Sequence, residues 1–261
     1  MYDHSIACLA MTEAAWLTLT PLYKEPAQRG IDFLCKARNP GFAWRYTVRP
    51  GDNDTSVTGW CVMALKSAEM QGIKFDPEAY QGAREWLKRV TNAQGKVGYE
   101  SPGDLGSILE GINDKWKTHP AMTAVGLLTK IFVDKKGDPW MKVAANEIVK
   151  DLPTWNEQEK TIDFYYWYYA ALALFQYDAP SGSAWKAFND SMKKALVPYQ
   201  GGQKMGCMDG SWDPAVDKWG SIGGRVYATA INVLTLEVYY RYAHVFGGDH
   251  AQTTAKEGAK K

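Results

Sequence analysis

The sequence is poor in cysteine, in long apolar runs and in excess charge. Its four cysteines, Cys8, Cys35, Cys61 and Cys207, are far apart and form no Cys-x-x-Cys pair, which argues against a zinc ribbon or a dithiol redox motif. Three of them lie in apolar text and are expected to be buried free thiols. The sequence therefore predicts neither a metal site nor a cofactor.

No apolar run reaches the ~20 residues that span a bilayer, and no secretory leader is recognisable at the N-terminus. The balance of 30 basic against 29 acidic residues creates no field that would attract nucleic acid. We therefore expect a soluble protein with no transmembrane segment and no nucleic-acid partner. The cellular compartment stays open, and one interpretation is an excerpt of a longer protein with flanking domains.

Alternation of apolar and polar residues, the pattern of a half-buried strand, is also lacking. Helical periodicity predicts helices over residues 3–18, 26–36, 55–70, 77–90, 121–133, 139–149, 163–177, 184–196 and 226–246. Pro26, Pro77 and Pro139 each stand in a predicted first turn, where a missing N–H costs nothing. The predicted fold class is all-α.

The predicted helices are of two alternating kinds. Some are amphipathic with charged flanks, as in residues 78–88 and 186–194. They are suited to an outer layer in which one face of each helix is exposed to solvent. Others carry small and aromatic residues on nearly every side, as in residues 57–68, 164–175 and 228–240, and are expected to be covered all round. This alternation predicts an α/α toroid with about five parallel inner helices, which would leave the ring incomplete.

Residues 1–246 are expected to form one toroid domain, because no linker or shift in composition divides them. Residues 247–261 turn to Asp, Thr, Lys and Gly without an apolar period, and are expected to be a disordered tail.

One motif recurs along the chain: a loop with Gly and Trp, a polar cap, and a helix rich in small and apolar residues. Its clearest copies are residues 41–46 with 54–65, and residues 210–214 with 224–236. Such self-similarity indicates that one supersecondary unit is stacked repeatedly. Trp44 and Trp212, in the two loops, are interpreted as packing wedges between repeats rather than ligand contacts.

Parts of the sequence resemble a known repeat. These are the Gly-x-Trp loop, the Asp-Thr-Ser-x-x-x-Trp segment at residues 54–60, Met-Ala-Leu at residues 63–65, and the second copy ending at residues 232–242. Squalene and hopene cyclases and the β subunits of protein prenyltransferases share this repeat. The resemblance covers most of the chain up to about residue 246. It implies a toroid whose central apolar cavity holds an isoprenoid chain, and it is less specific for chemistry than for fold.

The cyclases protonate an alkene with the middle acid of an Asp-x-Asp-Asp-Thr-Ala motif. The resemblance places Asp54 on this motif, but Asn53 occupies the position of the middle acid; shifting the match by one residue puts Thr55 where the third acid should be. One carboxylate is missing in either alignment. Asp54, helped by Asp52, is the expected proton donor. The zinc ligands of the prenyltransferases have no counterpart here.

A further site is expected where the inner helices begin. When the predicted inner helices are aligned with one another, the same position at the helix start is occupied by Asp54, His119, Asp163 and Arg225. His4 occupies a similar position in the first helix. If the helices are parallel, these side chains gather at one mouth of the cavity, at the positive ends of the helix dipoles. The alternative is structural: Asp54 and Asp163 act as N-caps, and His119 is a loop residue. Arg225 would then bind a loop carbonyl or pair with Asp213 or Asp217.

Aromatic side chains are the expected lining of the cavity. Trp60, Tyr166, Trp167 and Tyr227 are the candidates, since their rings would stabilise a carbocation or a quaternary ammonium. Packing is the alternative role. Long Gly-rich connections at residues 95–116 and 201–224 are expected to overhang the same mouth as binding or lid segments.

Three functions remain open on the sequence. The first is a terpenoid cyclase-like isomerase or isoprenoid-binding relative. The second is a non-catalytic binding or scaffold module of a larger protein. The third is a carbohydrate-active toroid that uses two of Asp54, Asp163 and Asp209 as acid and base.

Overall fold

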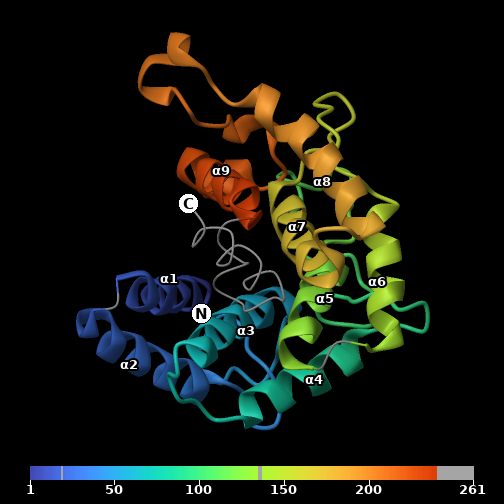
Figure 1. Ribbon diagram of the computed structural model, residues 1–261. Helices are drawn as coiled ribbons and strands as arrows, with labels where there is room; N and C mark the ends of the chain where they lie inside the picture. Colours follow the sequence, from blue (N-terminus) through green and yellow to red (C-terminus); the bar gives the residue numbers. More distant parts are fainter. Residues whose placement is uncertain (19, 135–136, 240–261) are drawn as a thin grey trace. The chain divides into compact units, whose positions relative to one another are not determined.

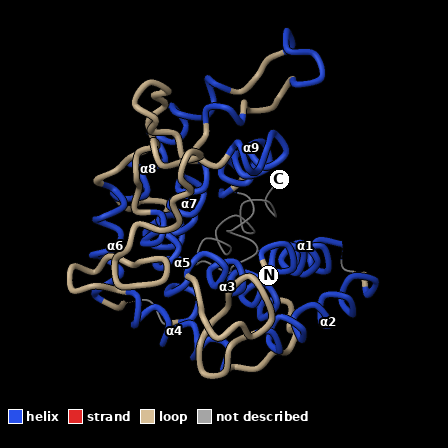
Figure 2. Tube along the Cα trace, turned by 180° about the vertical axis from the view of Figure 1, so that it is seen from behind, coloured by secondary structure: helices blue, strands red, loops and turns tan. Residues whose placement is uncertain are grey.

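The computed structural model describes residues 1–18, 20–134 and 137–239, and it is all-α in these ranges (Figure 1). No β-strand occurs in them, and an isolated antiparallel bridge joins Thr91 to Val97 (Figure 2). The predicted fold class is therefore confirmed.

The long helices are α1 (Tyr2–Thr18), α2 (Pro21–Ala37), α3 (Thr55–Met70), α4 (Glu78–Val90), α5 (Ala121–Val133), α6 (Pro139–Val149), α7 (Phe164–Asp178), α8 (Ser183–Leu196) and α9 (Gly220–Leu236). Short 3₁₀ turns follow α8: η1 (Val197–Tyr199), η2 (Gln203–Met208) and η3 (Pro214–Val216). The bounds of α3, α5 and α6 are those that the sequence predicts.

α1, α4, α7 and α8 differ from their predicted bounds by one residue, and α2 and α9 differ by more. α2 begins at Pro21 behind the cap Thr20, so Pro26 lies inside the helix and not in its first turn. The backbone bond that Pro26 cannot make falls at an exposed turn, where Leu22 is 69% exposed and water is available to the free carbonyl. α9 contains a kink at Gly224 (φ 69°), just before the predicted start at Val226. It ends at Leu236, and residues 240–246 of the predicted helix lie outside the described residues.

The described chain divides into two compact units. Unit 1 comprises Met1–Asp104 and Thr129–Gly137, and unit 2 comprises Leu105–Leu128 and Asp138–Tyr239, so that the division passes through α5. A single domain over residues 1–246 stays a prediction, and the predicted disordered tail, 247–261, lies outside the described residues.

In unit 1, α1 and α3 run in the same direction. Tyr2 donates to Ser56 at the start of both helices (2.5 Å), and Thr12 donates to Ser67 nearer their ends (2.7 Å). α4 returns antiparallel to α3, because Trp86 near its end donates to Thr55 at the start of α3.

Unit 2 repeats this arrangement with α7 and α9. The backbone N–H of Lys218 donates to Ile162 O just before the two helices begin (3.1 Å), and the rings of Phe175 and Tyr239 meet near their ends, 6.3 Å apart. α8 returns beside α7, with Trp185 in its first turn against Phe175 near the end of α7 (5.2 Å). Each unit therefore contains parallel neighbours joined through returning helices, as the helical-hairpin repeat predicts.

Burial separates the two kinds of helix, with an exception. In α3 all residues from Thr55 to Leu65 are buried, and α7 is buried from Tyr166 to Gln176. The expectation of cover all round is wrong for α9, where Val226 is 84% and Val233 is 38% exposed. The reason is that, among the described elements, α9 packs mainly against α7 and η3, which leaves one side uncovered.

The two repeat loops are anchored by the same contact. The indole Nε1 of Trp44 donates to Leu34 O near the end of α2 (2.8 Å), and that of Trp212 donates to Leu196 O at the end of α8 (3.0 Å). Both indoles are fully buried. These contacts favour the packing role that the sequence predicts for the two tryptophans.

All four thiols are free in this structure. Cys8 and Cys61 are buried as predicted, Cys35 is half-buried, and Cys207 is exposed. Among the described helices, none combines the length and apolarity required to cross a bilayer.

Candidate functional site

The carboxyl group of Asp54 lies at the start of α3 and is completely buried. Its Oδ1 accepts the backbone N–H of Val57 (2.7 Å), so Asp54 is the N-cap of the helix. Its own N–H donates to Trp44 O (3.0 Å), which ties it to the repeat loop. Within the described residues, Oδ2 has no hydrogen-bond partner of ordinary geometry. One oxygen of Asp54 is thus structural and the other is available.

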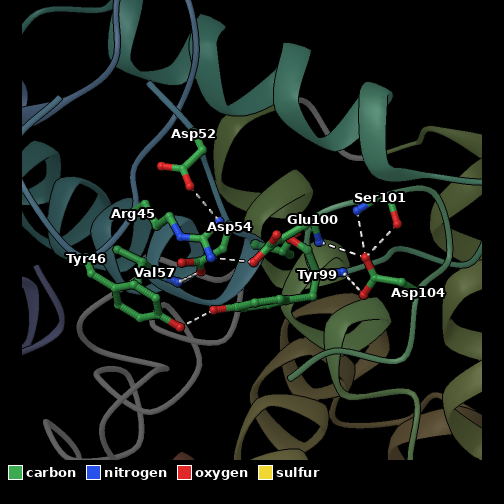
Figure 3. Close-up of polar contacts among 10 residues, drawn as sticks. Arg45, Tyr46, Asp52, Asp54, Val57, Tyr99, Glu100, Ser101 and Asp104 are labelled. Carbon is green, nitrogen blue, oxygen red and sulfur yellow. Dashed lines mark hydrogen bonds and ion pairs between the residues drawn. The ribbon is translucent and has the colours of Figure 1, made fainter. Parts of the chain in front are cut away.

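Two loops meet over this carboxyl group (Figure 3). Arg45 and Tyr46 belong to the first loop, and Tyr99 and Glu100 to the second. Arg45 Nη2 pairs with Glu100 Oε1 (2.5 Å), and the Tyr46 and Tyr99 hydroxyls are hydrogen-bonded to each other. Arg45 Nη1 also pairs with Asp52 Oδ2 (3.0 Å).

Asp104 fixes the second loop. Its carboxylate accepts the backbone N–H groups of Tyr99 (2.8 Å), Glu100 (2.8 Å) and Ser101 (2.6 Å). The loop is also joined to α3, because the Thr55 N–H donates to Tyr99 O (3.0 Å). The sequence marks this stretch only as a long Gly-rich loop and does not point to Tyr99 and Glu100. The reason is that their partners, Tyr46 and Arg45, lie more than fifty residues away in the chain.

Burial raises the pKa of Asp54 to about 7. The Val57 N–H, the Arg45 guanidinium and the Tyr99 hydroxyl act against this rise, while the negative charge of Glu100 adds to it. Burial also raises the pKa values of Tyr2 and Tyr99 above their ordinary range, and the charge of Asp54 adds to this. The carboxyl group of Asp54 therefore keeps its proton to a higher pH than an exposed aspartate does, and the phenols beside it are neutral.

This arrangement is suited to proton transfer. A neutral carboxylic acid in an apolar, aromatic surrounding is a general acid. The rings of Tyr2 and Tyr46 lie 5.9 Å apart beside it, and aromatic faces attract a cation with about 0.5–2 kcal/mol each.

Asn53, which stands at the position of the middle acid of the cyclase motif, has a structural role in this protein. Asn53 Oδ1 accepts from Asn39 Nδ2 and from the Ala43 N–H (3.0 Å each), so Asn53 holds the repeat loop and has no acidic proton. The side chain of Asp52 is 60% exposed, and it reaches the site through Arg45.

Two of the other predicted site residues, His119 and Asp163, both contact Tyr166 in unit 2. His119 Nδ1 lies 2.8 Å from Asp151 Oδ2, and its ring stacks on Tyr166 at 5.0 Å. Asp163 caps α7 by accepting the Tyr166 N–H (2.9 Å), and its Oδ2 lies 3.6 Å from Lys218 Nζ. His119 and Asp163 therefore both contact Tyr166, His119 at the ring and Asp163 at the backbone N–H.

Asp217 is a further buried acid in unit 2, which the sequence suggests only as an ion-pair partner for Arg225. It accepts the N–H groups of Phe164 (2.7 Å) and Trp219 (2.9 Å) instead. Burial, and then the charge of Asp163, raises its pKa to about 8.

Arg225 and His4 have structural contacts. Arg225 Nη1 donates to Trp212 O and Ser211 Oγ (3.1 Å each), and Nη2 lies 3.5 Å from Asp213, which matches the loop-anchor alternative. His4 Nε2 lies 2.8 Å from Gly30 O, and its ring meets Phe33, so it faces α2.

The predicted lining residues have mixed positions. Tyr166 turns its hydroxyl to the end of α6, donating to Ile148 O (3.1 Å) and Asp151 O (2.8 Å). Trp167 is fully buried with its ring edge against Phe164. Trp60 is 7% exposed, and Tyr227 is half-buried. Their role in lining a cavity stays a prediction.

The described part of the chain contains no group of three or more side chains placed to hold a metal ion. Comparison of the chain with protein-family models gives no match, and comparison with curated proteins gives none either. The resemblance to the cyclase repeat therefore stays a hypothesis, and the geometry around Asp54 is the firmest basis for a function.

Proposed function

We propose that the protein is a terpenoid cyclase-like isomerase in which Asp54 donates a proton to an isoprenoid ligand. The observation that carries the proposal is the state of this one carboxyl group. It is fully buried, its pKa is raised to about 7, and its Oδ2 is free of hydrogen bonds among the described residues. The parallel neighbours within each unit support the α/α toroid that belongs to the same proposal.

In the proposed reaction, the O–H bond of Asp54 breaks and the proton forms a C–H bond with an alkene carbon. The resulting carbocation is redistributed by cyclisation or by a shift of the double bond. The cation then loses a proton from a neighbouring carbon to the Asp54 carboxylate, which forms a new double bond and restores the acid, so the product is a neutral isomer of the same mass as the substrate.

The groups around Asp54 favour the charged state that follows proton transfer. The Val57 N–H and the Arg45 guanidinium stabilise the carboxylate. The phenol rings beside it would attract the cation. Because a carboxyl group with a pKa near 7 is a weaker acid than an exposed Asp, these stabilising groups are an essential part of the proposal.

A second candidate is a non-catalytic binding or scaffold module of a larger protein. The capping bond from Val57 favours it, since an N-cap is worth about 1 kcal/mol to a helix whether or not the residue does chemistry. The carbohydrate-active alternative has less support: Asp209 is exposed, and Asp163 is engaged with the Tyr166 N–H and lies 3.6 Å from Lys218 Nζ.

The test is the substitution Asp54→Asn. Asparagine also caps a helix but has no acidic proton, so isomerisation should fall at least 100-fold while the helix is preserved. Purified protein would be incubated with squalene and with shorter linear isoprenoids, and products of unchanged mass would be sought by gas chromatography and mass spectrometry.

The matched control is Asp138→Asn, which alters the N-cap of α6 (Trp140 N to Asp138 Oδ1, 2.8 Å) in the same way. It should retain turnover. Equal turnover by Asp54→Asn and the parent protein would refute the proton-donor role. Absence of turnover in the parent, with an isoprenoid recovered by solvent extraction of the purified protein, would favour the binding module.

A further inference from the structure

The contacts over Asp54 have a regular pattern that the proposed reaction alone does not explain. Arg45 and Tyr46 are consecutive residues of one loop, and Tyr99 and Glu100 are consecutive residues of the other. The ion pair Arg45–Glu100 and the hydroxyl pair Tyr46–Tyr99 therefore join the same two loops twice, side by side (Figure 3). We call these four residues the clasp.

The clasp leads from the surface to the buried acid. Tyr46 is 46% exposed, whereas Tyr99 is 8% exposed and Asp54 is fully buried. The side chain of Arg45 is 19% exposed and that of Glu100 is 45% exposed. An ion pair that is only partly in water is screened less than one at the open surface. Arg45 is also held by a second carboxylate, because its Nη1 pairs with Asp52 while its Nη2 pairs with Glu100.

We propose that the clasp positions the Tyr99 hydroxyl against the carboxyl group of Asp54, and that Arg45, Tyr46 and Glu100 are positioning residues for this acid. The inference rests on the proposed function for its purpose, because it identifies what controls the proposed proton donor. Its geometry is independent of any substrate. Asp104 holds the backbone of the second loop through three N–H groups, and the clasp holds the side chains of Tyr99 and Glu100 in that loop.

The chemical reason lies in how the hydroxyls share their protons. When Tyr46 donates to Tyr99, the Tyr99 hydroxyl keeps its own hydrogen available to turn toward Asp54 once this acid is ionised, which favours the carboxylate. Without the clasp, Tyr99 has no fixed partner on its loop side and its contact with Asp54 weakens. The charged and titratable groups that face Asp54 are Arg45, Glu100, Tyr99, Tyr2 and Cys61.

The experiment is a pH titration of the Asp54 carboxyl carbon by NMR, in protein labelled with ¹³C at aspartate Cγ. The resonance is assigned by its absence in Asp54→Asn. The variants are Tyr99→Phe, Tyr46→Phe and Glu100→Gln, and no substrate is needed.

All three variants should raise the titration midpoint of Asp54 by about half a pH unit or more. Tyr99→Phe removes the hydroxyl itself. Tyr46→Phe changes no charge and acts only by releasing Tyr99. Glu100→Gln is the sharpest case, because loss of a negative charge alone lowers the midpoint of a neighbouring acid, whereas release of the clasp raises it.

Hydrogen exchange gives a second readout. The Thr55 N–H donates to Tyr99 O (3.0 Å), so release of the second loop should speed exchange of this amide about tenfold in Tyr46→Phe and Glu100→Gln. The matched control is Glu25→Gln, which breaks an exposed Arg29–Glu25 pair of the same length (2.5 Å). It should leave both the Asp54 midpoint and the Thr55 amide unchanged.

An Asp54 midpoint that does not move in Tyr46→Phe, or that falls in Glu100→Gln, would overturn the inference. In that case the two residues act as solvent-exposed neighbours and not as positioning residues. The outcome is separate from that of the proposed function: a clasp confirmed by titration in a protein without isomerase activity would leave the positioning intact and remove only the reaction.

Discussion

The two oxygens of Asp54 have different surroundings. Oδ1 accepts the Val57 N–H at the start of α3, and Oδ2 faces the phenols without a hydrogen bond among the described residues. The two interpretations that the sequence leaves open, N-cap and acid, are therefore compatible in one side chain. The cap holds the carboxyl group in place, and burial keeps it protonated to an unusually high pH.

This burial predicts a pH-dependent stability. A carboxyl group whose pKa is raised to about 7 on folding stabilises the native state below its unfolded value of 3.8, and the contribution is lost as the pH rises through 7. Asp54→Asn removes this loss. The advantage of the variant over the parent should grow by on the order of 3 kcal/mol between pH 5 and pH 9, almost all of it below about pH 7. Urea unfolding at the two pH values measures the difference.

Asp138→Asn again serves as control for the effect on the cap, because the side chain of Asp138 also accepts a backbone N–H, that of Trp140, at the start of a helix (2.8 Å). It should shift stability equally at both pH values. A difference between parent and Asp54→Asn that does not grow with pH would show that Asp54 is ionised in the folded protein at neutral pH.

At the scale of the element, the repeat loop depends on a glycine in the returning helix. A Cβ atom added to Gly82 of α4 would lie 1.9 Å from Phe42 O and 2.9 Å from Arg38 Nη1. Arg38 donates to the same carbonyl (3.1 Å), so the space is filled by backbone and by a guanidinium. The close approach of α4 to the loop that carries Trp44 therefore requires glycine at this position.

We predict that Gly82→Ala destabilises the protein by about 2 kcal/mol or more, although alanine is the better helix former. The loop would have to move away from α4, and the cost of that movement exceeds the gain in helix propensity of about 1 kcal/mol. Thermal unfolding by circular dichroism is the measurement. The neighbouring Gln81→Ala, on the exposed side of α4, should leave the melting temperature nearly unchanged, and a stabilised Gly82→Ala variant would contradict the packing described here.

At the scale of the whole chain, two groups of carboxyls act on stability in opposite directions. Burial raises the pKa of Asp54 to about 7 and that of Asp217 to about 8. Hydrogen bonds and ion pairs outweigh burial at two other acids: Lys130 and Arg84 lower the pKa of Asp134, and His119 and Lys117 lower that of Asp151. The first group stabilises the fold at low pH and the second group at higher pH.

The expected consequence is a maximum of stability in a window around pH 4, because the raised pKa values of Asp54 and Asp217 lower stability from their unfolded value of 3.8 upwards. Below this window Asp134 and Asp151 lose their ion pairs as they are protonated. Above it, Asp54 and Asp217 ionise in buried positions through pH 7 and pH 8. Calorimetric melting temperatures from pH 3 to pH 9 test the prediction, and a melting temperature that rises steadily from pH 6 to pH 9 would contradict it.

Sequence and structure agree most closely where local signals are strong. The bounds of α3, α5 and α6 follow from caps, from a proline in the first turn and from apolar periodicity, all of which act within a few residues. The parallel direction of α1 and α3 follows in turn from the repeat, because two copies of one hairpin must begin at the same end. The position of Asp54 at the start of α3 is likewise evident from the sequence, whereas its role as an acid stays a prediction from the resemblance to the cyclase motif.

What the sequence does not reveal is decided by contacts across long stretches of chain. The clasp joins residues 45–46 to residues 99–100, and no local pattern pairs an Arg-Tyr dipeptide with a distant Tyr-Glu dipeptide. The exposed side of α9 depends on which neighbours pack against it. The protonation of Asp54 depends on burial by groups from three different segments. Sequence therefore determines where helices begin and which acid stands at their start, while tertiary packing decides the environment of that acid and with it its chemistry.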